Sequence, residues 1–496
     1  RHGPAMSTRT FGITVLADFI LNEGVDGVLD TLTQRAGVTA VALNPTVTAA
    51  TEEGNGSFQP PTDAGASPRI FDRPLWGKTS LWVRSGPSYI PDESLFADTP
   101  YRPRPANDLT EASGHIIAEF VDAALDRDLE VYFQLSGQSA PAMRDADRPL
   151  LPGGVIPDRM ADTGSLASDP IRAYLRGQVT NLLREYPNIT GFRPDWPEYP
   201  CYKLDEAFQD FSPHVRTWAG QNGYAFDEIE AEVGALYRYL HGSLTNDDLA
   251  SLASAERGRM SQLGLLRQYP AVFEWLRLKS DLSVDMVRHW RQIVDDATTD
   301  SSVKKLSANA FMPPLTLFTG FDFARAAAYC DAASPKLYTM HWTVMVDFWG
   351  RHLMKHNPGL DETLLVHALA NLFDLADEPP GDCLADFHYP EPDEPHPVSV
   401  AAQQRRISQA VHMSQNRADT HSEGMRKESV GFSKSGGLPV TPLVHGYGPL
   451  EDVAGRFKLV ADSEADGVWI NRYGYLSDAK LDAVGQIWRE SEGNRP

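Results

Sequence analysis

The chain has 496 residues, of which 42% are hydrophobic and 23% charged, an ordinary composition for a globular protein with a large core. Its formal net charge of -22 argues against binding nucleic acid or anionic lipid, because an acidic surface repels phosphate groups. Three cysteines in no paired spacing argue against a disulfide framework, and no apolar run approaches the roughly 20 residues that span a bilayer.

Short apolar runs alternate with helical patterns along almost the whole chain, which is typical of βα units and a parallel sheet. The pattern predicts strands at residues 11–18, 38–44, 129–135, 189–195, 305–311, 335–341, 439–445 and 467–471. This order favours an α/β fold in which the strands close into a (β/α)8 TIM barrel. An open doubly wound sheet is the alternative, but no glycine-rich phosphate motif follows the first strand.

Two connections are longer than a plain barrel needs. Residues 45–108 form a Pro- and Gly-rich connection after the second strand, too long for a simple βα loop. Residues 205–299 are mainly helical, so we expect a helical insertion after the fourth strand. We interpret residues 7–496 as one catalytic barrel that contains this insertion.

Polar and aromatic side chains gather where the predicted strands end, whereas the strand bodies are apolar. Active sites of such barrels form at the C-terminal ends of the strands. The clustering favours a polyhydroxylated substrate, which needs fixed donors and acceptors together with flat aromatic faces. The expected substrate-binding residues are Asp18, Asn44, Gln134, Arg193, Trp196, Asn309, Tyr338, His341, Trp342, His445, Tyr447 and Arg472.

The segment 191–200, Gly-Phe-Arg-Pro-Asp-Trp-Pro-Glu-Tyr-Pro, carries the strongest signal. Arg193 and Asp195 are two apart on a strand and share a face, so the guanidinium is expected to hold the carboxylate ionised. Glu198 lies beyond a proline turn beside aromatic residues, which is expected to raise its pKa. Two carboxyls in different environments suit glycosidic bond cleavage, and Asp195 and Glu198 are the expected catalytic pair. The alternative is a structural Arg–Asp pair with Glu198 solvated on a loop.

The segment Gly191-Phe-Arg-Pro-Asp195 resembles the nucleophile segment of alpha-amylase-type glycoside hydrolases. The resemblance implies that Asp195 is the nucleophile and Arg193 its orienting partner. It fails at the fifth strand, which has no Glu for the acid, and at the seventh, where no Asp follows His445. A looser resemblance over most of the chain is to uncharacterised glycosyl-hydrolase-like barrels, and it implies the fold and superfamily. It is carried by Phe311-Met-Pro313 and Pro335-Lys-Leu-Tyr-Thr-Met340.

The sequence therefore favours a glycoside hydrolase that cleaves a small oligosaccharide or glycoside and needs no cofactor or metal. A metal-dependent sugar isomerase, epimerase or lyase is the alternative, with His341 and His445 as ligands beside Asp195 or Glu198. Hydrogen bonding of the two histidines to substrate is the simpler interpretation. A barrel that only binds carbohydrate is a third reading. Asp18 and Asp347 are the reserve acids if the second carboxyl comes from elsewhere.

Carbohydrate is the expected partner, and neither nucleic acid nor membrane is expected. The oligomeric state is left open by the sequence, and a homo-oligomer is among the alternatives. Because the residues after Met6 lack a basic-then-apolar leader, we expect a soluble protein of the cytoplasm.

Overall fold

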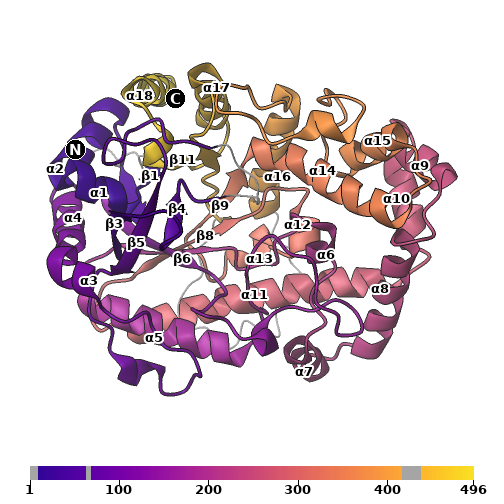
Figure 1. The fold of residues 1–496 in the computed structure, drawn as a ribbon, viewed down its shortest axis with the longest axis horizontal. Helices are drawn as coiled ribbons and strands as arrows, with labels where there is room; N and C mark the ends of the chain where they lie inside the picture. The colour runs from indigo at the N-terminus through magenta and orange to yellow at the C-terminus, as the bar shows by residue number, and fades with distance from the viewer. Residues whose placement is uncertain (1–8, 63–68, 416–436, 496) are drawn as a thin grey trace, which may run out of the picture.

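The structure is a computed structural model that describes residues 9–62, 69–415 and 437–495. Eight parallel strands in these ranges close into a barrel in the order β1-β11-β10-β9-β8-β7-β6-β2 (Figure 1). The closure is made by β1, in which Gly12 lies opposite Trp469 of β11 and Ala40 of β2. The (β/α)8 barrel expected from the sequence is confirmed.

The barrel strands are β1 (Thr10–Thr14), β2 (Ala40–Leu43), β6 (Glu130–Ser136), β7 (Gly191–Asp195), β8 (Lys305–Ala310), β9 (Ala332–Leu337), β10 (Leu443–His445) and β11 (Gly467–Asn471). The α-helices are α1 (Ala17–Glu23), α2 (Val25–Thr31), α3 (Asp108–Ser113), α4 (His115–Leu125), α5 (Asp169–Glu185), α6 (Leu204–Ala207), α7 (Pro213–Gln221), α8 (Phe226–Leu240), α9 (Asn246–Ala253), α10 (Gly258–Leu266), α11 (Ala271–Ala297), α12 (Thr316–Thr319), α13 (Phe323–Ala326), α14 (Thr339–His356), α15 (Glu362–Leu372), α16 (Val400–Gln415), α17 (Leu450–Ala461) and α18 (Asp478–Gly493). Shorter helical turns are η1 (Leu32–Ala36), η2 (Glu93–Phe96), η3 (Asp145–Asp147), η4 (Leu384–Phe387) and η5 (Tyr473–Tyr475).

Side chains fill the interior of the barrel. Trp469 fits there because Gly12 has no side chain: a Cβ on Gly12 would stand 2.3 Å from Cε3 of Trp469. The guanidinium of Arg193 lies over the Trp469 ring, 3.7 Å from its centroid. Tyr132 packs edge-on against the same ring, with the centroids 5.8 Å apart. Because this stack plugs the interior, a substrate site has to form at the strand ends.

The connection after β2 carries its own small sheet. Strands β3 (Thr46–Thr51), β5 (Leu81–Pro87) and β4 (Ser57–Gln59) pair antiparallel in the order β3-β5-β4. The connection ends at α3, which Asn107 caps by accepting hydrogen bonds from the backbone N–H groups of Leu109 and Thr110. The long connection expected after the second strand is therefore confirmed.

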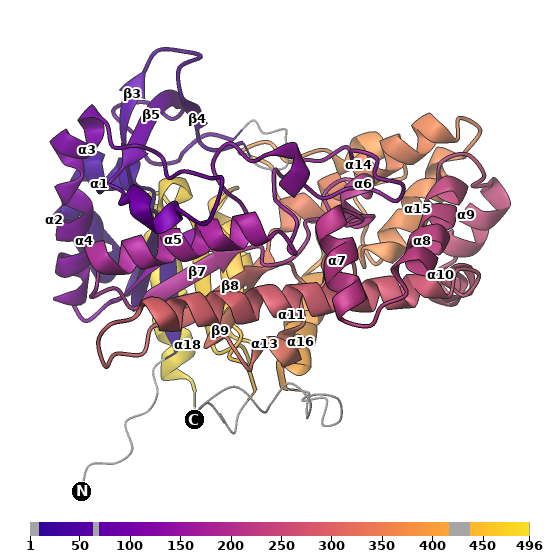
Figure 2. The same cartoon turned by 90° about the horizontal axis from the view of Figure 1, so that it is seen from below.

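Helices α6 to α11 lie between β7 and β8, as expected for a helical insertion after the fourth strand. The long helix α11 packs against α5 at one end and α8 at the other (Figure 2). Helices α8, α9 and α15 gather at the side of the molecule away from α1 and α2 (Figures 1 and 2). Among the helices that the structure describes, none combines the length and the apolar character needed to cross a membrane.

The prediction of a sixth strand over residues 335–341 is wrong for its second half. β9 ends at Leu337 and α14 begins at Thr339, so His341 and Trp342 lie in the first turn of a helix. Residues 339–346 are all buried, and a fully buried apolar run looks the same in a helix as in a strand. The first strand is also shorter than predicted, since β1 ends at Thr14 and Asp18 lies in the first turn of α1.

Candidate active site

Asp195 ends β7, and its carboxylate faces the ammonium group of Lys336 at the mouth of the barrel. Oδ1 of Asp195 lies 2.6 Å from Nζ of Lys336, and the two side chains are 26% and 6% exposed. A buried ammonium group needs such a partner. The pair therefore fixes a negative charge, partly open to solvent, at the strand ends. The sequence interpretation missed Lys336, although it alternates with Ser334 along β9 and so shares the inward face.

Arg193 does not form the expected ion pair with Asp195. Two residues along a strand are separated by roughly 6.5 Å, so the guanidinium lies one layer deeper in the barrel than the carboxylate. It donates hydrogen bonds to side chains of β8 and β9: Ser307 at 3.1 Å, Asn309 at 2.8 Å and Ser334 at 3.2 Å. Full burial lowers the pKa of Arg193 to about 9. Arg193 thus forms the floor of the site and holds Asn309, in place of the ion pair with Asp195 that the sequence predicted.

Glu198 is fully buried, so the alternative of a solvated loop carboxylate is wrong. Its Oε1 accepts a hydrogen bond from the backbone N–H of Phe311 at 2.6 Å, and its Oε2 accepts one from Oγ1 of Thr319 at 2.5 Å. Burial raises the pKa of Glu198 to about 7, against the opposing effect of these hydrogen bonds and of Lys336. The raised pKa expected from the sequence is found. Because the protein binds both carboxyl oxygens, a substrate does not reach them in this arrangement.

Trp196 lies directly beside the ion pair. Its backbone has a left-handed φ of 57°, an uncommon conformation for a bulky residue. The turn is held by hydrogen bonds from Gln138 Nε2 to the Trp196 carbonyl at 2.7 Å and from the Trp196 N–H to the Asn309 carbonyl at 3.1 Å. The indole stacks on Phe311 with centroids 6.2 Å apart, and Nζ of Lys336 lies 4.0 Å from its ring centroid. An aromatic face therefore borders the charged pair.

Tyr338, His341 and His445 form an aromatic group on the β9 and β10 side of the mouth. The Tyr338 ring meets His341 and His445 edge to face, with centroids 5.2 Å and 4.9 Å away. Nζ of Lys336 lies 5.8 Å from the centroid of Tyr338, which ties the group to the ion pair. Nη1 of Arg69, from the connection after β2, lies 3.5 Å from Nε2 of His445. That connection therefore reaches the strand ends, and the sequence interpretation missed Arg69.

Several buried polar atoms at the strand ends have no hydrogen-bond partner among the described residues. They are Oδ2 of Asp18, Oε1 of Gln134, Nδ2 of Asn309 and Nε1 of Trp196. Buried polar groups are normally paired, so unpaired ones gathered at a barrel mouth point to a polar ligand. Burial raises the pKa of Asp18, and hydrogen bonding with Thr48 and with its own backbone, together with the charge of Arg472, opposes this rise. Asn44, just after β2, is exposed.

Other predicted rim residues contact the protein itself. Trp342 lies under the guanidinium of Arg406, 3.8 Å from its ring centroid, and is 2% exposed. The hydroxyl of Tyr447 donates to the carbonyl of Pro390 at 2.8 Å. The reserve acid Asp347 pairs with Arg351 one turn further along α14, at 2.6 Å. Each of these side chains is thus engaged by another part of the protein.

The structure does not assemble a metal centre from His341 and His445. Among the residues that the structure describes, one group of three His, Cys, Asp or Glu side chains is close enough to share an ion: His241, His352 and His356. None of the three is at a strand end, and the group contains neither Asp195 nor Glu198. The ligand set required by the isomerase alternative is therefore not formed.

Two cavities of about 780 Å³ lie away from the carboxylates. One lies beside α7 and α8 and is lined by Pro152, Phe211 and Tyr237 among others. The second lies between α16 and α17. The candidate active site is accordingly defined by the chemistry at the strand ends and not by these hollows.

No known protein family matches the sequence, and no curated protein matches it. Among solved structures, the chain is similar to a beta-galactosidase from the psychrophilic Marinomonas ef1, with 12% identity and a TM-score of 0.47; the match covers 97% of this chain and 59% of that one. A beta-galactosidase from Bacillus circulans sp. alkalophilus has 12% identity and a TM-score of 0.33, over 68% of this chain and 43% of that one. An Ostrinia furnacalis Group IV chitinase, in complex with allosamidin, has 8% identity and a TM-score of 0.42. The match covers 98% of this chain and 100% of that one. The chain spans less than two thirds of the length of both galactosidases, and likenesses of this strength assign no function to it.

Proposed function

We propose that this chain is a glycoside hydrolase in which Asp195 acts at the anomeric carbon. One observation carries the proposal: a partly exposed carboxylate at the end of the fourth barrel strand is held by Lys336 beside the face of Trp196. Barrels of this fold place their active sites at these strand ends. A fixed negative charge there can attack, or stabilise, the positively charged carbon that develops as a glycosidic bond breaks.

The surroundings of Asp195 suit a sugar. Trp196 is partly exposed beside Asp195, and the C–H groups of a sugar ring can pack on the part of the indole that Lys336 and Phe311 leave open. Gln134 Oε1 and Asn309 Nδ2 supply an acceptor and a donor that no described residue pairs with. A polyhydroxylated ligand would satisfy both kinds of group. The substrate class we propose is accordingly a glycoside or short oligosaccharide.

We assign the proton donor to Asp18 in place of Glu198. Both oxygens of Glu198 bind Phe311 and Thr319, which makes it a positioning residue that joins the turn after β7 to the end of β8. Asp18 follows β1, its Oδ2 has no partner among the described residues, and burial raises its pKa. A carboxyl that keeps its proton can donate it to the glycosidic oxygen as the bond from that oxygen to the anomeric carbon breaks. Water or Asp195 then forms the new bond to the anomeric carbon.

The first experiment tests Asp195 with the purified full chain and a panel of aryl glycosides that differ in sugar and anomer. We expect hydrolysis of at least one of them, and a fall in kcat of about three or more orders of magnitude for Asp195→Asn with unchanged folding by circular dichroism. Azide added to Asp195→Gly should restore turnover and yield a glycosyl azide. Near-normal turnover in Asp195→Asn contradicts the assignment.

The second experiment separates Asp18 from Glu198 by the leaving group of the substrate. A variant that lacks its acid still cleaves glycosides of acidic phenols, because these leave without a proton, but loses those of poor leaving groups. We expect this pattern for Asp18→Asn. Glu198→Gln should lower the rates of both substrates by the same factor. If Glu198→Gln, and not Asp18→Asn, loses only the substrates with poor leaving groups, then Glu198 is the proton donor.

A further inference from the structure

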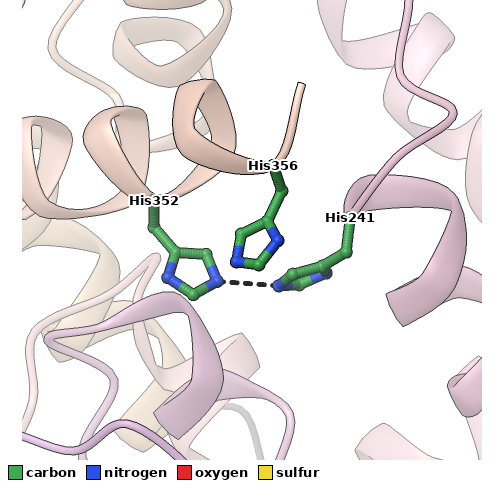
Figure 3. A group of neighbouring side chains, drawn as sticks. All are labelled: His241, His352 and His356. Atoms are coloured by element: carbon green, nitrogen blue, oxygen red, sulfur yellow. Dashed lines mark hydrogen bonds between the residues drawn. The ribbon is translucent and has the colours of Figure 1, made fainter. Parts of the chain in front are cut away.

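Three histidines from two distant parts of the chain converge on the helical side of the molecule. His352 and His356 lie one turn apart near the end of α14, and His241 follows the last residue of α8. Figure 3 shows the three rings pointing toward one another across the gap between the two helices. One ring nitrogen from each histidine lies within 4.8 Å of those of the other two. Helical spacing of four residues puts His352 and His356 on one face, as in helical metal sites.

Nε2 of His241 lies 2.7 Å from Nε2 of His352. Two imidazole nitrogens at this distance share either a proton or a cation, because their lone pairs otherwise repel. The ring centroid of His356 lies 4.8 Å from the centroid of His241 and 4.8 Å from that of His352. The three rings therefore form a triangle around a common centre. Divalent zinc binds histidine nitrogen at about 2.0–2.1 Å, a length that small movements of these rings would provide.

A hydrogen bond from the opposite side of the ring orients His241. Its Nδ1 lies 2.6 Å from the backbone carbonyl of Tyr237, which can only accept, so Nδ1 carries the proton. The lone pair of His241 is therefore on Nε2, the atom that faces His352. Metal-binding histidines are usually held in this way by a carbonyl or carboxylate behind the ring.

A buried carboxylate stands next to the histidines. Oδ1 of Asp205 lies 3.9 Å from Nε2 of His241 and 3.6 Å from Nε2 of His352. The carboxylate is 7% exposed and is held by the hydroxyl of Tyr237 at 2.8 Å and the backbone N–H of Asp158 at 2.8 Å. Three imidazoles and one carboxylate are donors of the kind that zinc takes in tetrahedral geometry.

The backbone around the cluster is fixed independently of the histidines. Asn357, the residue after α14, donates from Nδ2 to the carbonyl of Leu240 at 2.7 Å. That bond joins the ends of α8 and α14 at the point where their histidines meet. The geometry is thus pre-organised, and His356, which is exposed, leaves the cluster open to solvent on one side for an ion to enter.

We infer that His241, His352 and His356 bind a divalent transition metal of the zinc class, with Asp205 as the fourth ligand. Nitrogen ligands disfavour magnesium and calcium, which prefer oxygen. With four protein ligands the site is structural and not catalytic. It would tie the insertion after β7, which supplies Asp205 and His241, to the helix after β9. The inference does not depend on the proposed glycosidase activity.

The test uses the full chain, stripped with a chelator, and titrates it with zinc and cobalt. We expect one equivalent of zinc to bind, the thermal unfolding midpoint to rise with zinc, and bound cobalt to give the intense visible absorption of tetrahedral nitrogen ligation. Asp205→Asn should weaken zinc binding by about 10- to 100-fold, and His352→Ala by more than that. His367→Ala, on α15 and paired with Asp382 outside the cluster, is the matched control and should bind zinc like the parent chain.

The cobalt spectrum of the unmutated chain keeps the test independent of any variant that fails to fold. Absence of the tetrahedral spectrum, together with no rise of the unfolding midpoint in zinc, would mean that His241 and His352 share a proton, and would overturn the inference. Equal zinc affinity in the parent chain and in His356→Ala would also overturn it. Metal content and glycoside hydrolysis are measured separately, so a failure of one proposal is not read as a failure of the other.

Discussion

Nζ of Lys336 and Oδ1 of Asp195 lie 2.6 Å apart although β8 separates the strands that carry them. The lysine side chain spans the neighbouring strand across the mouth of the barrel and passes over the ring of Trp196 on the way. A long, flexible side chain is needed for that reach. The contact joins two sides of the mouth and sets the position of the carboxylate that we propose to be catalytic.

Replacing Lys336 with methionine keeps the length of the side chain and removes its charge. We expect kcat/KM toward the best glycoside to fall roughly 100-fold, because the carboxylate is no longer held in place. We also expect a loss of about 1–3 kcal/mol in stability from the unpaired carboxylate. Lys458→Met is the control: Lys458 pairs with Asp462 on the surface, 60% exposed, and its removal should leave both quantities nearly unchanged.

Glu198 should make stability depend on pH. Its pKa is raised from 4.5 to about 7 in the folded chain, so between these values the folded state keeps a proton that the unfolded state has lost. The stability contributed by this group is complete below pH 4.5 and falls as the pH rises to about 7, by on the order of 3 kcal/mol. The thermal unfolding midpoint should therefore fall less over this range in Glu198→Gln than in the parent chain.

The comparison of Glu198→Gln with the parent chain cancels other titrating groups that are the same in both. An exposed glutamate, Glu228 in the first turn of α8, provides the control, and Glu228→Gln should follow the parent curve. Identical pH profiles for Glu198→Gln and the parent would show that Glu198 is ionised in the folded chain.

Gly12 should tolerate no side chain. A Cβ at this position would stand 2.3 Å from the Trp469 ring, so Gly12→Ala must displace the ring that supports Arg193. We expect a cost of about 1–3 kcal/mol, measured as a lower thermal unfolding midpoint, and a loss of activity. Gly27→Ala in helix α2 meets only Cβ of Glu23, at 3.8 Å, and should stabilise the chain by up to about 1 kcal/mol.

Trp196 should contribute to substrate binding through its ring. Trp196→Leu removes the aromatic face, and we expect KM to rise about 10-fold if the ring is worth roughly 1.4 kcal/mol to a stacked sugar. Trp196→Phe keeps an aromatic face and should retain most of the affinity. Equal KM values for the leucine and phenylalanine variants would place the sugar elsewhere.

The order and type of the main elements could be read from the chain because they depend on local patterns. Apolar runs alternate with amphipathic helices, and α5 begins at Asp169 because Ser168 caps it and Pro170 suits its first turn. The sequence could not show where β9 ends, because the strand leads almost directly into a buried helix. Residues 339–346 are all buried, and burial does not distinguish α14 from a longer β9.

The sequence by itself determined a parallel barrel with an acidic, aromatic segment after its fourth strand, because strand periodicity and turn chemistry are written in neighbouring residues. Only the tertiary structure decided which charge meets Asp195, that both oxygens of Glu198 are used by the protein, and that His241 meets His352. Asp195 and Lys336 are 141 positions apart in the sequence. Glu198 is 113 and 121 positions from its two partners, and His241 is 111 positions from His352. Such pairings follow from how the barrel closes and how its helices pack, and no local pattern encodes them.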